Sequence, residues 1–208
     1  MHAPAPQVPF GRLQCTGRDP IRSMVARQVD WARQMAFHTD ASGTLLRQYF
    51  RVGRTSPVVE LQWKPVADGW REEGFSVLPG SRVELVLGLG DLQPAAVSSL
   101  LRMVPTRAFA KGEVQHGSSR VRDHGLWIRE VELPGWHWPE ENVAELVAML
   151  RAEPRWDEVL ALRGLQSAQV AIAYHGAVET MAGFHLDRDL VAELGALGLE
   201  LDIDLYAA

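Results

Sequence analysis

The order in which strand-like and helix-like segments follow one another after residue 82 constrains the fold of this chain most. Residues 83–89 alternate in a pattern typical of a strand. Gly90, Asp91 and Pro94 follow, and a turn glycine, a capping carboxylate and an early proline together indicate a helix start. The next predicted elements are a short helix at 95–103, ended by Pro105, a strand at 106–113, and a strand at 126–133 after a polar loop.

The remainder of the chain continues this alternation. Glu140 and Glu141 stand in the first turn of a predicted helix, where its dipole favours acids, and Gly164 and Gly198 end later helices. The predicted elements are helices at 139–150 and 156–163, a strand at 168–174, a helix at 187–197 and a strand at 199–206. The order predicts an α+β fold, a ferredoxin-like α/β sandwich with an added helix–strand unit.

The first 80 residues give a different pattern. Apolar residues at helical spacing predict a helix over 21–37, and two β-rich runs at 45–52 and 58–63 predict a hairpin. A short strand is expected at 75–78. We therefore expect a helix and β-hairpin to precede the ferredoxin-like unit, with the hairpin strands either separate or extending the same sheet. The expected domains are a flexible leader at 1–23, this helix-plus-hairpin region at 24–80, and the ferredoxin-like domain at 81–208.

Composition limits the class of protein. The chain has 208 residues, of which 47% are hydrophobic, enough for a sizeable core. Its single cysteine, Cys15, excludes an internal disulfide framework, and no apolar run is long enough to span a membrane. The N-terminus lacks the apolar core of a secretory signal. A cytoplasmic location is expected.

Charge is unevenly distributed along the chain. Residues 1–54 carry eight arginines and three aspartates, whereas residues 139–208 carry four arginines and thirteen acids. An acidic half disfavours nucleic acid, because phosphate binding needs clustered Lys and Arg. It is compatible with a basic protein partner, which an acidic surface attracts over long range. A solvated acidic face without a partner is the simpler alternative.

An aromatic segment stands directly before the helix predicted at 139–150. Trp136 and Trp138 flank His137, and tryptophan is enriched at binding hot spots. In the alternative, one tryptophan packs under the helix start as a hydrophobic staple. The predicted binding residues are this segment and the acids after it: Trp136, His137, Trp138, Glu140, Glu141 and Glu145.

No combination of residues indicates a catalytic centre, and no cofactor is predicted. The chain lacks the Gly-x-Ser-x-Gly elbow and the P-loop motif. Two histidine loops are the only metal candidates, and nothing in their spacing forces convergence. They hold His116 and His124 with Asp123 and Glu113, and His175 and His185 with Asp187.

From about residue 82 to the C-terminus, the chain resembles the bacterial domain-of-unknown-function family 4279. The residues that carry the resemblance are Gly90, Asp91, Pro94, Pro105, Thr106, Lys111, Gly112, Glu113 and Trp127. Each has a structural interpretation. We expect Gly90 to adopt a positive φ, Asp91 to cap a helix, Pro94 to start it and Trp127 to fill the core. Lys111 and Glu113, two apart on the predicted strand, are expected to share one face.

The resemblance brings no established activity, so no catalytic residue can be carried over. Small bacterial domains of this kind often accompany toxin and secretion systems, which implies an immunity or accessory protein by analogy. We therefore expect a non-catalytic protein that docks a basic partner through its acidic C-terminal half. The alternatives are a small-molecule sensor domain and a metal-assisted hydrolase using the loop histidines. Edge strands pairing between chains would make a homodimer.

Overall fold

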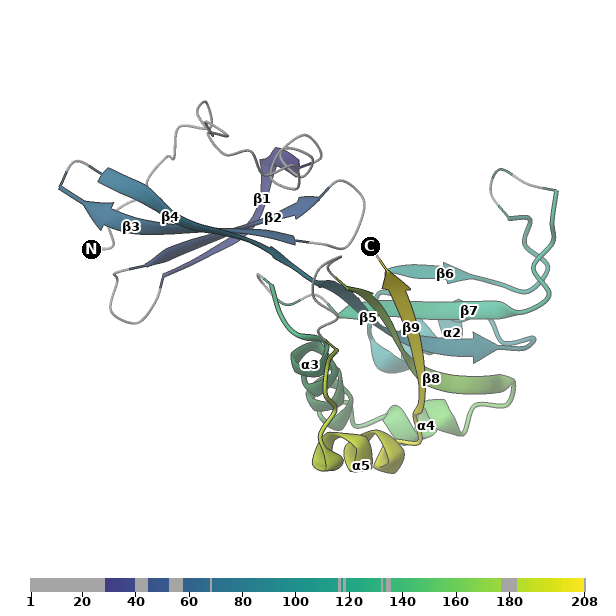
Figure 1. Cartoon of the computed structure of the whole chain (residues 1–208). Coiled ribbons are helices and arrows are strands. Elements are labelled where there is room, and N and C mark those ends of the chain that lie inside the picture. Colours follow the sequence, from purple (N-terminus) through teal and green to yellow (C-terminus); the bar gives the residue numbers. More distant parts are fainter. Residues whose placement is uncertain are drawn as a thin grey trace.

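The computed structural model describes residues 29–39, 45–52, 58–67, 69–115, 117, 119–131, 133, 136–176 and 183–207. For residues 29–39, 51, 52, 75 and 207 it describes the backbone only. The described strands form two sheets, one of four strands and one of five (Figure 1). The predicted leader at 1–23 lies outside the described residues.

The first sheet is an antiparallel meander in which each strand pairs with the next along the chain. The predicted hairpin is confirmed as its middle pair, and the strand expected at 75–78 is the end of a longer one. Its strands are β1 (Val29–Thr39), β2 (Leu46–Val52), β3 (Val58–Val66) and β4 (Gly69–Leu78). Because it is a separate sheet, the hairpin does not extend the ferredoxin-like sheet.

The helix predicted at 21–37 is wrong where the structure describes it, since residues 29–39 form β1. In β1, Phe37 pairs with Gln48 and Thr39 pairs with Leu46 of β2. Pairing with a neighbouring strand overrides local periodicity when the segment carries β-favouring residues. Trp31 and Phe37 stand an even number of residues apart, so they also fit the two-residue period of a strand.

The second sheet has the strand order β6-β7-β5-β8-β9. The strands are β5 (Gly80–Leu89), β6 (Arg107–Phe109), β7 (Gly125–Val131), β8 (Leu165–Gly176) and β9 (Glu200–Ala207). The helices are α2 (Pro94–Leu101), α3 (Pro139–Arg151), α4 (Trp156–Leu160) and α5 (Arg188–Ala196). The first four strands pair antiparallel, whereas β9 is parallel to β8.

This order confirms the predicted fold class. Counted along the chain, β5, β6, β7 and β8 are strands one to four, and their order in space is 2-3-1-4, that of a ferredoxin-like sheet. α5 and β9 are the added helix–strand unit, which extends the sheet beyond β8.

The hydrophobic core of the second unit lies between its sheet and the helices on one face (Figure 1). The alternation of β5 sends Leu85 and Leu87 toward the helices, and neither is exposed. Trp127 of β7 and Val170 of β8 are fully buried beside them. The helices contribute Val97, Leu101, Val143, Leu146, Leu150, Val159 and Leu194.

A single residue, Pro79, separates β4 of the first sheet from β5 of the second. β5 is central in its sheet and pairs with β7 on one side and β8 on the other. The first sheet is therefore joined directly to the strand that organises the second.

Candidate functional site

The two tryptophans of the predicted binding segment contact each other at the junction of the sheets. The rings of Trp136 and Trp138 meet edge to face, with centroids 4.7 Å apart. Trp136 Nε1 donates a 2.7 Å hydrogen bond to the carbonyl of Pro79, the residue between β4 and β5. Both indoles are half-buried. Trp136 therefore ties the loop before α3 to the sheet junction.

The residues after these tryptophans shape the start of α3. Glu141 Oε2 accepts a 2.8 Å hydrogen bond from the backbone N–H of Trp138, the pairing of a capping box. The same oxygen lies 3.6 Å from His137 Nδ1. Glu141 is exposed, but its carboxylate is engaged in holding the helix terminus.

The other two acids of the predicted site have different surroundings. One carboxylate oxygen of Glu140 is buried and has no hydrogen-bond partner among the described residues. The pKa of Tyr174 is raised, first by burial and second by the negative charge of Glu140. Glu145 is exposed. The structure thus brings the predicted residues onto one loop and the first two turns of α3, where Glu141 and Glu145 are the exposed acids.

Asp91 and Lys111, two residues of the family resemblance, form an ion pair. Lys111 Nζ donates to Asp91 Oδ1 at 2.8 Å. The hydrogen bond and charge of each partner lower the pKa of Asp91 and raise that of Lys111. Two expectations are therefore wrong. Asp91 does not cap α2, whose N-cap is Gln93, and Lys111 lies in a turn after β6 and not on a strand face shared with Glu113.

Gly90 is needed for close approach and not for a positive φ, so that expectation is also wrong. Its N–H donates to the carbonyl of Gly164 at 2.8 Å. A Cβ at this position would lie 3.1 Å from Gln166 Nε2 and 3.3 Å from Gly164 O. Gly112, by contrast, has a φ of 86°, in the region that favours glycine.

The remaining residues of the resemblance have structural surroundings. Trp127 is fully buried, as expected, and its Nε1 donates to Ser98 Oγ at 3.0 Å. Thr106 Oγ1 accepts from the backbone N–H of Glu130 at 3.0 Å, which joins the start of β6 to β7. Pro94 begins α2, as expected. Pro105 follows the helix, which already ends at Leu101, and Glu113 lies in the turn after β6.

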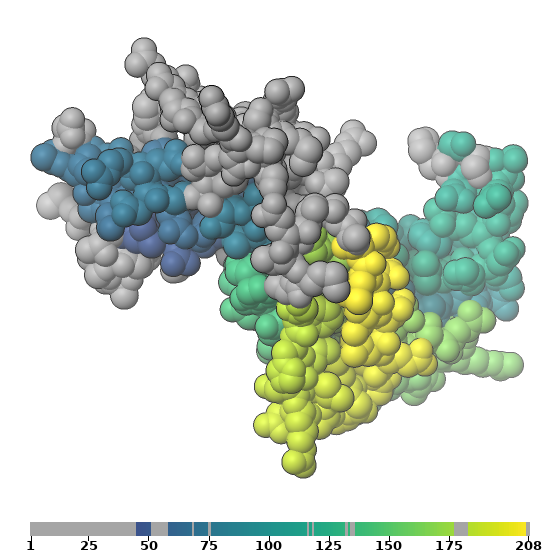
Figure 2. All heavy atoms as spheres, in the orientation of Figure 1, coloured from purple at the N-terminus to yellow at the C-terminus, as the bar shows by residue number. Residues whose placement is uncertain are grey.

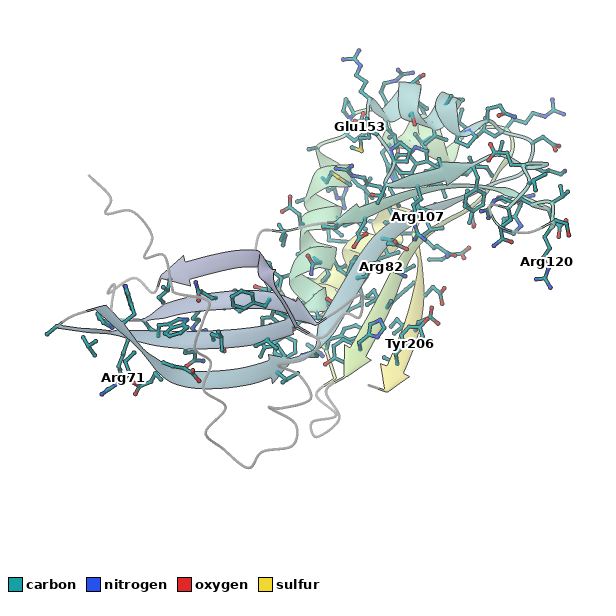
Figure 3. The ribbon with its side chains drawn as sticks, turned by 90° about the horizontal axis from the view of Figure 1, so that it is seen from above. Arg71, Arg82, Arg107, Arg120, Glu153 and Tyr206 are labelled. Carbon is teal, nitrogen blue, oxygen red and sulfur yellow. The ribbon has the colours of Figure 1, made fainter. Side chains whose placement is uncertain are left out.

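Sequence reasoning missed a charged cluster on the sheet face opposite the helices. Glu84 of β5 is only 6% exposed, and its Oε1 accepts a 2.7 Å hydrogen bond from Arg107 Nη2 of β6. Arg82 Nε lies 3.3 Å from the same oxygen. The two arginines, labelled in Figure 3, are about half exposed. The sequence pattern that could have indicated this cluster is the alternation of Glu84 with core residues within a buried strand.

β9 forms one edge of this sheet, and its residues 200–206 are exposed; Figure 2 shows part of this strand in yellow at the surface. Its exposed large apolar residues are Leu201, Ile203, Leu205 and Tyr206. The Tyr206 ring stacks on His175 of β8, with centroids 4.6 Å apart. The pKa of His175 is lowered, first by burial and then by the charge of Arg82.

The histidines of the two predicted loops have different surroundings in the described part of the chain. His175 stacks on Tyr206, and His124 and His185 are exposed, while His116 lies outside the described residues. Among the described residues no group of three or more His, Cys, Asp or Glu side chains is placed to hold a metal ion.

Residues 80–208 match the family described as Domain of unknown function (DUF4279). The chain belongs to this family. The matched range coincides with the ferredoxin-like unit and includes every residue on which the resemblance rested. Neither a curated protein nor a solved structure matches the chain. None of the described helices, all of which lie in the DUF4279 region, is long and apolar enough to cross a membrane.

Proposed function

We propose that this chain is a non-catalytic bacterial binding protein of the cytoplasm, of the immunity or accessory kind. It docks a basic partner protein through the acidic surface of its C-terminal half. The observation that carries the proposal is a surplus of exposed acids over their basic partners in residues 139–208.

Two of the four arginines in this half already have acidic partners. Arg151 pairs with Glu193, and Arg155 pairs with Glu158. Several exposed acids form no ion pair with a described residue, and they lie on or beside α3, α4, α5 and β9: Glu145, Asp157, Asp189, Glu200, Asp202 and Asp204.

Such a surface favours a basic partner for a physical reason. Acids without internal counter-charges produce a negative potential that accelerates association with a positive surface and weakens as salt rises. Contacts that displace water from these carboxylates then require Lys or Arg on the partner, because a buried unpaired charge is costly.

The test is capture by the tagged full chain from its native cell, at low and at high salt, followed by mass spectrometry. We expect one basic protein that is retained at low salt and released at high salt. Binding of that protein is then compared across three variants that each remove two acids. D157N/D189N and D202N/D204N lie in the acidic half, whereas E113Q/D123N lies outside it.

At least one of the first two variants should weaken binding, and E113Q/D123N should leave it unchanged. Binding that is insensitive to salt and to both pairs in the acidic half would contradict the proposal. Retention of full affinity by W136A/W138A would remove the tryptophan loop from the interface without affecting the role of the acids.

A further inference from the structure

The two edges of the ferredoxin-like sheet differ in how they are protected. β6 is only three residues long, and the guanidinium of Arg122 lies 3.4 Å from the ring centroid of its last residue, Phe109. β9 has eight residues, and no described strand pairs with its outer edge. An edge strand of this length presents a row of backbone N–H and C=O groups that can pair with another chain.

One row of β9 side chains is apolar and exposed. In register with β8, Leu201 pairs with Val170, Ile203 with Ile172 and Leu205 with Tyr174. Paired residues point to the same face of a sheet, so this row lies on the helix-covered side. The β8 members are 0%, 1% and 5% exposed, whereas their β9 neighbours are 42%, 41% and 72% exposed. The row of apolar side chains that is buried on β8 thus continues onto β9, where the described residues leave it partly exposed.

The alternate row of β9 is acidic. Glu200, Asp202 and Asp204 pair in register with Gln169, Ala171 and Ala173 of β8, on the sheet face opposite the helices. All three acids are exposed and form no ion pair with a described residue. The Tyr206 hydroxyl donates a long hydrogen bond of 3.5 Å to Asp204 Oδ2. Tyr206, labelled in Figure 3, is the next residue of this row after Asp204 and lies near the end of the strand.

These two rows discriminate between possible partners. If two copies of β9 paired antiparallel with their apolar rows on one face, the acids of one copy would face the acids of the other. Like charges directly opposite each other destabilise a strand pair. A strand with Lys or Arg at alternate positions would instead match both rows at once, with apolar side chains on the covered face.

We propose that β9 receives an extended segment of the basic partner as an added strand, in which apolar side chains alternate with Lys or Arg. This inference rests on the proposed function, and it specifies where and in what conformation the partner binds. Main-chain hydrogen bonds to the outer edge supply affinity, and the two side-chain rows supply specificity.

The experiment uses the full chain and a labelled peptide of four Val-Lys repeats, which matches the eight residues of β9. A peptide of the same composition with four Val followed by four Lys is the control. We expect the alternating peptide to bind more tightly in fluorescence anisotropy. Bound peptide should also slow hydrogen exchange of the β9 amides, because strand addition pairs them.

D202N/D204N should weaken binding of the alternating peptide by about fivefold, as expected for two lost cross-strand charge pairs. D157N/D189N removes the same charge elsewhere in the acidic half and should leave binding unchanged. Ile203→Thr keeps a β-branched side chain while removing apolar surface, and should weaken binding without abolishing it.

Equal binding of the two peptides, or equal weakening by the two double variants, would overturn strand addition while leaving a general acidic docking surface. If binding of the native partner to the unmodified chain did not depend on salt concentration, the proposed function would be overturned as well. Concentration-dependent dimerisation that protects the β9 amides without peptide would also overturn the inference, because a second copy would then occupy the edge.

Discussion

The two sheets of this protein bury their strands in different ways. The ferredoxin-like sheet has helices on one face, and its core joins residues from every layer. In the meander, Leu46, Phe50, Val59 and Leu61 lie on one face and are at most 3% exposed, yet no described helix belongs to that sheet. Alternating strands and helices therefore supply both layers of their own core, whereas the buried face of the meander has no described helix of its own to cover it.

The sheets also differ in how each accommodates a buried glutamate. Glu60 of β3 accepts hydrogen bonds from the Tyr49 hydroxyl at 3.2 Å and from Gln62 Nε2 at 2.8 Å. Glu84 of β5 is held by Arg107 and Arg82. The meander therefore satisfies its carboxylate with two neutral donors and one arginine, Arg47, whose Nη1 lies 3.5 Å from Glu60 Oε1, whereas the ferredoxin-like sheet uses two arginines.

The largest expected effect comes from opening the core of the ferredoxin-like sheet. Trp127→Ala should reduce the free energy of unfolding by about 3–5 kcal/mol, because the indole is fully buried. Chemical denaturation followed by circular dichroism measures this, and Trp127→Phe should lose less. Phe50→Ala is the matched change in the meander. If the sheets are independent units, each variant shifts only its own unfolding transition, whereas a single transition shifted by both variants would show that the two sheets unfold together.

Gly88 tests how closely β5 and β8 approach. An added Cβ would collide with the Ser167 hydroxyl, so Gly88→Ala should cost about 1–3 kcal/mol in thermal or chemical unfolding. Gly195 in α5 is the control, since a Cβ there meets nothing within 4 Å. Gly195→Ala should be neutral or stabilising by up to about 1 kcal/mol. If Gly88→Ala and Gly195→Ala destabilised the protein equally, the contact with Ser167 of β8 would not be the cause of the destabilisation.

Substitution of the buried glutamates should have a smaller effect on the free energy of unfolding. Glu84→Gln should cost about 1 kcal/mol, since it leaves Arg107 and Arg82 without their counter-charge and both arginines are half exposed. Glu60→Gln should cost less, because it removes the counter-charge of one arginine at 3.5 Å, Arg47, and an amide can still bond Tyr49 and Gln62. Parallel urea titrations decide the order of the two. The reverse order would show that the meander depends more on its buried charge.

The smallest effect is a pH dependence at His175. Its pKa lies below the ordinary value of 6.5 in the folded protein, so the fold favours the neutral ring. The stabilisation is present above pH 6.5 and is lost as pH falls through the folded pKa. Unfolding measured on either side of pH 6.5 should show this decline, and His175→Phe should reduce it. An unchanged decline in that variant would assign it to other groups.

Much of the ferredoxin-like sheet could be predicted because its signals are local. Pro94 and Pro139 stand at helix starts, and Gly198 has a φ of 69° at a helix end. Asp187 caps α5, with its Oδ1 accepting from the Leu190 N–H at 2.7 Å. Each signal acts within a few residues, so the order of elements follows from the sequence alone.

The errors arose where a distant residue decides the structure. β1 is a strand because β2 pairs with it, although its spacing also fits a helix. Asp91 pairs with Lys111, twenty residues away, in place of capping the nearby helix. Trp136 could be identified as unusual, yet its hydrogen-bond partner Pro79 lies 57 residues earlier. Sequence patterns identify such side chains but not their partners.

The one-residue link at Pro79 has a mechanical consequence. Tension applied to the meander would enter the ferredoxin-like unit through β5, which is hydrogen-bonded to a neighbour on each side. A strand held along both edges resists being pulled out better than one held along a single edge, because more bonds must shear together. A force applied to the first sheet would therefore act on β5, the central strand of the second sheet, before it acted on the exposed edge strand β9.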